Sequence, residues 1–212
     1  DAGKLLNIEE MRDNDYVITT KELVQWCQEE GLDLDKITPS KFDSVLGEGT
    51  GAGMIFGNTG GVMEAALRTV YRVLEGKEAP ADFYQLRPVR GLSNRKEAEV
   101  TIAGKKLRVC ILYGTAAAEK FLAEDMNGYH FVEVMTCPGG CISGAGQPDC
   151  GSVPVSDVVR KKRIQSLYQA DEQAERRNSM DNPEIGTIYH EFFKEPLSML
   201  SEKLLHTTYK GK

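Results

Sequence analysis

The sequence lacks several features that would place it in familiar classes. No stretch stays apolar for the roughly 20 residues that a membrane-spanning helix needs. Nothing near Asp1 resembles a signal peptide, and no internal repeat or low-complexity tract is present. The 26 basic residues are outnumbered by 32 acidic ones, which gives a net charge of −6. Nucleic-acid binding needs a basic surface, so we expect neither a nucleic acid nor a membrane as the partner.

Common catalytic motifs are also missing. The three histidines, at positions 130, 190 and 206, lack the spacing of metal ligands, and no Ser/His/Asp set stands out. The glycines between residues 47 and 61 are not followed by the lysine of a phosphate-binding loop. The sequence therefore disfavours serine hydrolases and nucleotide-binding enzymes, although such a glycine-rich segment could still enclose another cofactor.

Cysteine is present in an odd number, five, which does not suit a secreted disulfide framework. Free thiols are typical of a reducing compartment, where grouped cysteines more often bind metal. At 212 residues, the chain can bury a substantial core without disulfides. The composition therefore predicts a globular protein from a reducing environment.

Residues 131–148 form the most informative stretch, since it contains both Cys137 and Cys141. Alternating apolar residues before Cys137 predict a strand, and the Pro-Gly-Gly after it predicts a sharp turn into a helix. Two cysteines on the first turn of a helix would share one face, where the helix dipole favours thiolates. Thiolates bind soft metals, above all iron in iron–sulfur clusters. The alternative is a structural pair or a redox disulfide, although such redox pairs usually have the spacing C-x-x-C.

The surrounding segments predict an α/β fold with a parallel or mixed sheet flanked by helices. Residues 97–103 and 106–113 are typical of two strands in a hairpin, with Cys110 packed inside. A helix over 116–124 and a strand over 130–136 follow. This succession indicates parallel strands, and Cys137 then falls at a carboxyl end, where sites in such sheets lie.

The N-terminal third predicts two further helices. We expect a buried strand over residues 16–20, then a helix capped by a threonine at its end that buries Cys27 in the core. Apolar residues at helical spacing predict a second helix over 62–74, directly after the glycines.

The C-terminal part is polar and helical. Residues 158–173 predict one helix, and two shorter ones follow over 185–193 and 197–205. Helices this polar indicate an arm laid over another surface. We expect the basic run 160–163 to be a solvated helix face. Cys150 is either a third ligand or a bystander.

Several segments resemble one known family. Residues 133–148, EVMTCPGGCISGAGQP, resemble the last of the three cysteine signatures of FeFe-hydrogenases. Residues 50–68, TGAGMIFGNTGGVMEAALR, resemble that family's glycine-rich segment, and residues 15–23 and 204–209 resemble two more of its segments. The resemblance covers nearly the whole chain.

The resemblance implies an oxidoreductase that reversibly reduces protons to dihydrogen at an H-cluster. This cofactor is a 4Fe-4S cubane joined through a cysteine sulfur to a diiron unit. On the family pattern Cys137 would ligate the cubane. Cys141 would bridge its two parts, as both metal ligand and catalytic residue. Met135, Phe56 and Gly57 would line the pocket of the diiron unit.

The chain also departs from the family pattern. Thr136 stands where alanine is usual, and Ala145 replaces the middle of three glycines. The family's other two signatures, T-S-C-C-P-G-W and M-P-C-x-x-K, are absent. We therefore expect residues 1–152 to be the C-terminal lobe of the H-cluster domain, and residues 153–212 to be a tail resembling the family's small subunit. The isolated chain is then expected to be inactive and without a complete cluster.

Two further expectations rest on the resemblance. The parent protein would be cytoplasmic and anaerobic, completed by the missing N-terminal half and supplied with electrons by ferredoxin or a similar carrier. The alternative function is that of a hydrogen-sensing or iron–sulfur assembly relative of the same fold, without hydrogen turnover.

Overall fold

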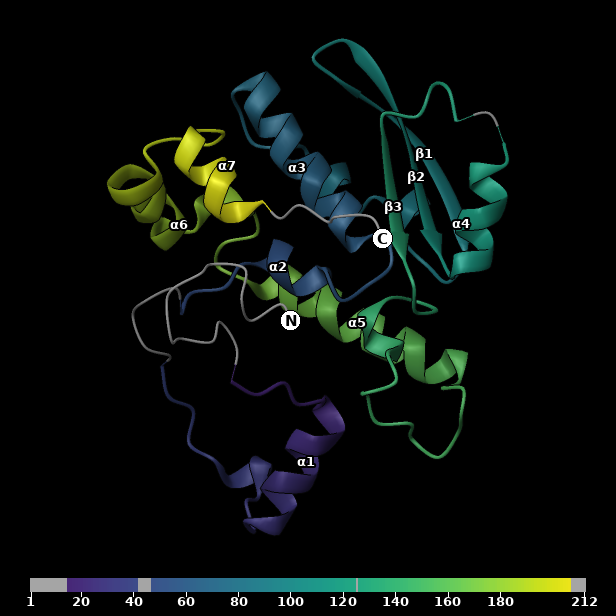
Figure 1. The fold of residues 1–212 in the computed structure, drawn as a ribbon, viewed down its shortest axis with the longest axis vertical. Helices are drawn as coiled ribbons and strands as arrows, with labels where there is room; N and C mark the ends of the chain where they lie inside the picture. The colour runs from purple at the N-terminus through teal and green to yellow at the C-terminus, as the bar shows by residue number, and fades with distance from the viewer. Residues whose placement is uncertain (1–14, 42–46, 125, 207–212) are drawn as a thin grey trace. The chain divides into compact units, whose positions relative to one another are not determined.

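The computed structural model describes residues 15–41, 47–124 and 126–206 (Figure 1). The chain divides into two compact units, one formed by residues 47–182 and the other by residues 1–46 together with 183–212.

A mixed three-stranded sheet forms the centre of the 47–182 unit. Its strands, in spatial order, are β1 (Arg95–Ile102), β2 (Lys105–Tyr113) and β3 (Phe131–Met135). β1 and β2 form an antiparallel hairpin, turned by Ala103 and Gly104 at positive φ. β2 and β3 are parallel, joined by helix α4 (Thr115–Leu122). The predicted fold class, a parallel or mixed sheet flanked by helices, is confirmed.

The central strand β2 is buried on both faces, as its continuous apolar run predicts. Val109 and Ile111 pack with Met63 and Leu67 of helix α3 (Gly61–Glu75). On the opposite face, the predicted core residue Cys110 is fully buried and packs in a second cluster with Phe121 of α4. Figure 1 shows α3 and α4 on either side of the sheet.

The sequence did not predict helix α2 (Gly51–Ile55), since its glycines indicated a loop. α2 packs against α5 (Asp157–Gln173), where Ala52, Ile55 and Tyr168 form a third core cluster. A Cβ on Gly51 would lie 2.2 Å from the Asp171 carboxylate, so only glycine lets the two helices approach this closely. α5 therefore belongs to the core of this unit, as well as being the polar helix that its composition predicts.

A fully buried ion cluster ties α3 to α5. Arg68 forms two 2.8 Å hydrogen bonds with the Asp171 carboxylate and a third, of 2.7 Å, with Glu64. Arg90 donates twice to Glu64, and its guanidinium lies 3.6 Å from the centre of the Tyr168 ring. Burial alone would raise the pKa of Asp171, but hydrogen bonds from its arginine partners outweigh burial and hold the pKa below its ordinary value.

Short 3₁₀ helices complete this unit. They are η3 (Ala81–Tyr84), η4 (Arg87–Val89), η5 (Cys141–Ser143) and η6 (Ser179–Asp181).

The other unit has helix α1 (Thr20–Glu29), which begins at the predicted cap. The side chain of Thr19 accepts from the Glu22 backbone, and the Glu22 carboxylate accepts from the Thr19 backbone. Two expectations here were wrong. Residues 16–20 form no strand and are exposed, and Cys27 is only half-buried, since α1 buries no residue at all. An apolar helix face predicts burial only if another element covers it.

The remaining elements of this unit are short helices. They are η2 (Leu34–Lys36), α6 (Pro183–Ile188), the π-helix η7 (Tyr189–Phe193) and α7 (Met199–Leu205). The helix expected over residues 197–205 begins at Met199 and is capped by Ser198. Within the described residues, no helix is long and apolar enough to cross a membrane.

Candidate functional site

The two cysteines lie on a turn that follows β3. Cys137 comes two residues after the strand, and Gly139 and Gly140 then reverse the chain at φ of 83° and 102°. Cys141 begins the three-residue η5 helix. The expectation that both cysteines share the first turn of one helix was wrong, because Cys137 precedes the turn and η5 is too short. A helix dipole therefore gives no support for their thiolates.

A second backbone segment, from the glycine-rich stretch, holds this turn. The Thr59 N–H donates to the Gly139 carbonyl at 3.0 Å, and the Ile142 N–H donates to the Gly57 carbonyl at 3.2 Å. A Cβ on Gly140 would lie 2.6 Å from the Gly57 carbonyl oxygen, closer than any side chain allows. The two glycine-rich stretches of the sequence therefore meet, backbone against backbone.

Cys141 borders an open hollow of about 390 Å³. Gly57, Met54 and Leu167 also line it, so its wall is largely apolar. Of the five residues predicted for the site, Cys141 and Gly57 line this hollow.

Cys137, Met135 and Phe56 do not line the hollow. Cys137 is half-buried on the same turn, and Met135 is half-buried at the end of β3. Phe56 caps the C-terminus of α2, and its side chain is 46% exposed. The structure thus places these residues on the segments next to the cysteine turn and leaves their roles as predictions.

The sequence did not predict that Arg163 of α5 binds the segment that follows the cysteine turn. One of its nitrogens donates to the Ile142 carbonyl at 2.7 Å, and the other donates to the Pro148 carbonyl at 2.5 Å. Arg163 also lines the hollow. The expectation that residues 160–163 form a solvated face was wrong for Arg163, since its guanidinium donates hydrogen bonds to two backbone carbonyls. It was also wrong for Arg160, whose side chain is only 14% exposed, whereas Lys161 and Lys162 are exposed as expected.

Cys150 is exposed, with its sulfur 3.4 Å from a nitrogen of Arg163. His130 accepts the backbone N–H of Arg108 through Nδ1 at 3.1 Å. The two alternatives for Cys150, third ligand or bystander, stay predictions.

Two charged side chains are buried behind the turn, and neither was predicted. Lys96 is 6% exposed and Glu133 5% exposed. Burial lowers the pKa of Lys96 to about 8, although the negative charge of Glu133 opposes that shift. Burial also raises the pKa of Glu133, opposed by two backbone N–H groups that it accepts and by Lys96.

The donor atoms at the site suit a soft metal. Cys137 and Cys141 are free thiols, with two glycines between them that remove side-chain bulk. Among the residues that the structure describes, no group of three or more His, Cys, Asp or Glu side chains gathers as a metal site. The chain therefore fits an iron–sulfur cluster as the donor of two thiolates, and a cubane held by four needs two more from elsewhere.

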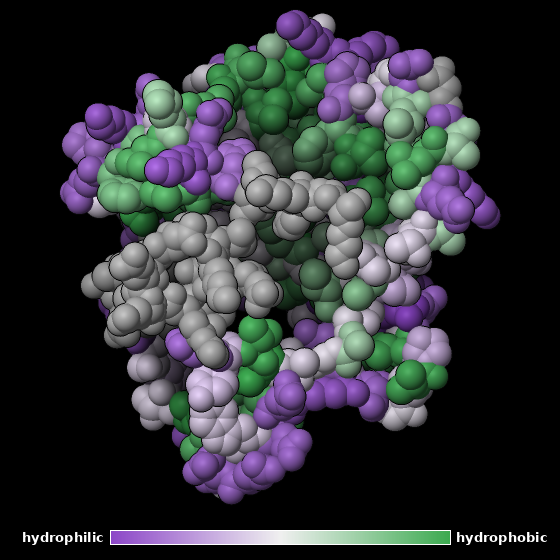
Figure 2. Space-filling view, in the orientation of Figure 1, coloured by the Kyte–Doolittle hydropathy of each residue, from purple (hydrophilic) through white to green (hydrophobic). Residues whose placement is uncertain are grey.

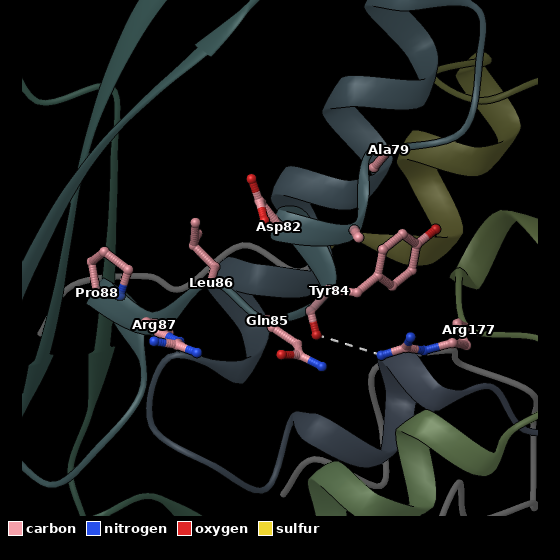
Figure 3. Close-up of a pocket in the computed structure, with 9 residues that line it drawn as sticks. Ala79, Asp82, Tyr84, Gln85, Leu86, Arg87, Pro88 and Arg177 are labelled. Atoms are coloured by element: carbon pink, nitrogen blue, oxygen red, sulfur yellow. Dashed lines mark hydrogen bonds between the residues drawn. The ribbon is translucent and has the colours of Figure 1, made fainter.

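A larger hollow, of about 620 Å³, lies between residues 79–88 and Arg177 (Figure 3). Arg177 reaches toward the Tyr84 carbonyl, at 3.5 Å, and donates to the buried Asp171 at 2.6 Å. No cysteine lines this hollow. Of its two arginines, Arg87 and Arg177, the second belongs to the ion cluster between α3 and α5.

Comparison with protein families gives two matches. Residues 4–145 match the family described as the iron only hydrogenase large subunit, C-terminal domain. Residues 157–212 match the iron hydrogenase small subunit.

Curated relatives fall into two groups. Iron hydrogenase 1 of Clostridium pasteurianum is 39% identical over 94% of this chain and 35% of its own length. The periplasmic hydrogenase large subunit of Nitratidesulfovibrio vulgaris is 44% identical over 65% of this chain and 33% of its own. The cytosolic Fe-S cluster assembly factor narfl of Xenopus tropicalis is 29% identical over 94% of this chain and 42% of its own. The chain thus spans about a third to two fifths of these relatives.

Solved structures agree with the sequence matches. An FeFe-hydrogenase structure that reports stepwise H-cluster assembly superposes with a TM-score of 0.74 at 33% identity, over 97% of this chain and 58% of that one. The family match covers well over half of the chain, and the fold is shared. The chain therefore belongs to the iron-only hydrogenase family, as the C-terminal region of its large subunit followed by the small-subunit segment.

Proposed function

We propose that this chain is the C-terminal part of an FeFe-hydrogenase that interconverts protons and dihydrogen at an H-cluster. The supporting observation is the meeting of the two glycine-rich stretches, which presents Cys137 and Cys141 as free thiols on one turn beside an open hollow. The chain belongs to a family whose named relatives include hydrogenases.

In this proposal each cysteine has its own role. Cys137 would ligate the 4Fe-4S cubane, and Cys141 would hold both the cubane and the diiron unit, as the catalytic residue of this chain. The cluster, when bound, supplies the redox chemistry of hydrogen turnover. Met135, Phe56 and Gly57 would line the diiron unit, where an apolar wall would limit water and tune the potential.

The protein part of the site is built by backbone. Gly140 has no side chain to keep its backbone away from Gly57, and the hydrogen bond from Ile142 to the Gly57 carbonyl fixes the residue next to Cys141. Arg163 holds the next residues by two carbonyls and brings a positive charge to the hollow. These residues bind and orient, so no proton transfer is assigned to them.

The remaining cubane thiolates would come from the rest of the parent protein. Two cysteines are half of the set that a cubane takes, and the matched relatives are about two to three times longer than this chain. The isolated chain is then inactive. We assign residues 1–152 to the lobe of the H-cluster domain and 153–212 to the small-subunit tail.

We also propose a cytoplasmic, anaerobic parent with ferredoxin or a similar electron carrier. Fusion of the small-subunit segment to the large-subunit region in one chain favours this location.

An iron–sulfur assembly factor without hydrogen turnover is the second candidate. The assembly factor from Xenopus aligns over 94% of this chain, as much as the Clostridium hydrogenase does, although at lower identity. A hydrogen-sensing relative belongs to the same alternative.

Gas evolution separates these functions. The complete parent, matured to carry its cluster, is supplied with a chemical reductant, and dihydrogen is measured by gas chromatography. Steady production that is lost in Cys141→Ser supports the hydrogenase. A parent fully loaded with iron that produces no dihydrogen points to the sensor or assembly function.

A further inference from the structure

We propose that Lys96 and Glu133 are positioning residues for the iron site, which they serve by fixing the backbone segment 57–60 against which the cysteine turn is built. Neither side chain touches a cysteine in the described contacts, so both act through that segment. The inference rests on the proposed function for its link to iron, but the support of the turn is a property of this chain alone.

The two residues lie in one row across the sheet. Lys96 of β1 is paired with Ile111 of β2, and Ile111 is paired with Glu133 of β3. All three are buried on the face that packs against α3. Lys96 shares this face of β1 with Ala98, Val100 and Ile102, so a charge stands where the pattern of the strand would place an apolar side chain.

Lys96 donates hydrogen bonds to the backbone carbonyls of two loops. Its ammonium donates to the Thr59 carbonyl at 2.9 Å, to the Thr59 hydroxyl at 3.3 Å and to the Gly91 carbonyl at 3.1 Å. An ammonium has three hydrogens, and these three acceptors use them all. Lys96 is thus a fully occupied buried donor, and Thr59 is its main partner.

Glu133 holds the other end of the segment. One carboxylate oxygen accepts the Gly60 N–H at 2.6 Å, and the other accepts the Met63 N–H at 2.8 Å. These groups belong to the N-terminus of α3, whose own cap residue, Gly60, has no side chain to satisfy them. A carboxylate there also meets the positive end of the helix dipole.

Thr59 links Lys96 to the cysteine turn through backbone hydrogen bonds. Its carbonyl accepts from Lys96, while its N–H donates to the Gly139 carbonyl inside the cysteine turn. On the other side of Asn58, the Gly57 carbonyl accepts from Ile142, the residue after Cys141. Glu133 is itself four residues before Cys137, on the strand that leads into the turn. Lys96 and Glu133 therefore fix the position of the cysteine turn, through Thr59 and through β3.

A purely structural purpose would be served better by apolar residues. Burying a charged side chain costs free energy, which an apolar side chain at the same position would avoid. Unlike apolar side chains, Lys96 and Glu133 form directional hydrogen bonds, and these define where Thr59 and Gly60 lie. This favours a positioning role over a packing role.

Hydrogen exchange of single amides in the 212-residue chain tests the support of the turn. In Lys96→Met and Glu133→Gln, we expect protection at Thr59 and Ile142 to fall by about tenfold or more, with the amides of β2 unchanged. The matched controls are Lys106→Met and Glu99→Gln, which change an exposed lysine–glutamate pair between β2 and β1 of the same sheet, at 2.9 Å. They should leave all of these amides as they are.

Two exchange results would overturn the inference. One is unchanged protection at Thr59, and the other is an equal loss across β2, which would make the pair part of the general core. If Lys96→Met does not fold, either of these results in the isosteric Glu133→Gln overturns the inference in the same way.

The link to iron is tested in the complete parent by electron paramagnetic resonance of the reduced cubane. Lys96→Met should shift the signal or lower its intensity per chain, whereas Lys106→Met should not. A normal signal in Lys96→Met despite lost exchange protection would overturn the link. A wild-type parent that assembles no cluster would contradict the proposed function and this link together, while the exchange result in the chain stands apart from both.

Discussion

Arg68 and Asp171 lie 103 residues apart in the sequence and meet in a fully buried ion pair with two hydrogen bonds of 2.8 Å. Arg68 belongs to α3 and Asp171 to α5, so the pair joins the helix after the glycine-rich segment to the helix that holds the cysteine turn through Arg163. A buried pair of this kind can be neutral in net stability, yet costly to break, because one charge is left without a partner.

Asp171→Asn should therefore destabilise the chain by about 3–5 kcal/mol, since Arg68 and Arg177 lose a charged acceptor. Urea unfolding followed by circular dichroism measures the free energy of unfolding. Glu99→Gln, which breaks the exposed pair with Lys106, is the control and should change it by about 0.5 kcal/mol or less. A loss below about 1 kcal/mol in Asp171→Asn would show that the ion cluster does not hold the two helices.

The buried Lys96 predicts an unusual dependence of stability on pH. Its pKa in the folded chain is about 8, below the ordinary value of 10.5. Between these values the unfolded chain binds a proton that the folded chain has released, so this group makes stability rise with pH. From pH 7 to 10 the gain is on the order of 2 kcal/mol.

Urea midpoints of wild type and Lys96→Met across that range isolate this contribution. The wild type should gain stability relative to the variant as pH rises from 7 to 10. Lys106→Met, at an exposed position, should follow the wild type. A difference between wild type and Lys96→Met that does not change with pH would contradict the burial of a charged lysine.

Gly140→Ala should disrupt the meeting of the two glycine-rich stretches. The added Cβ would face the left-handed strain of φ 102° and a backbone oxygen at 2.6 Å. Gly104→Ala is matched, because Gly104 has φ 72° in the hairpin but nothing within 4 Å of the added carbon. Strain alone costs about 1–2 kcal/mol, so Gly140→Ala should cost clearly more than Gly104→Ala in urea unfolding. Equal losses would mean that the close contact contributes nothing.

Local patterns predicted most of the sheet. The alternation in β1, the apolar run of β2 and the Gly104 hairpin follow directly from residue order, and the succession β2–α4–β3 gives the parallel pair. The cap at Thr19 was also readable, because a capping box lies within four consecutive residues.

Elements that depend on distant partners were not predicted. α2 has three small residues in five and exists because α5 packs on it. The roles of Lys96, Glu133 and Arg163 need carbonyls or N–H groups supplied by other segments, and no spacing in the sequence reveals them. Cys27 was placed in the core from its helix face, yet α1 buries nothing. Figure 2 also shows hydrophobic residues, in green, on the surface. The exposed hydrophobic side chains include Phe131 and Val134 of β3.

The candidate site, like the fold, has parts that the sequence predicts and parts that it does not. The two cysteines and the glycine-rich segment stand out in the sequence by residue type, and the family resemblance links them to one cofactor. Their backbone contacts could not be predicted, because they depend on how β3 and the segment before α3 are placed by the sheet.

The central claim is that this chain supplies Cys137 and Cys141 to an iron–sulfur cluster that the rest of the parent completes. Iron and acid-labile sulfide are measured after anaerobic reconstitution of the complete parent, its Cys137→Ser and Cys141→Ser variants, a Cys27→Ser control, and the 212-residue chain alone. We predict a stable cubane in the parent and in Cys27→Ser, a large loss of iron in the other two variants, and no stoichiometric cubane in the chain alone. A stable, stoichiometric cubane in the chain alone, or undiminished iron in both variants, would contradict the account.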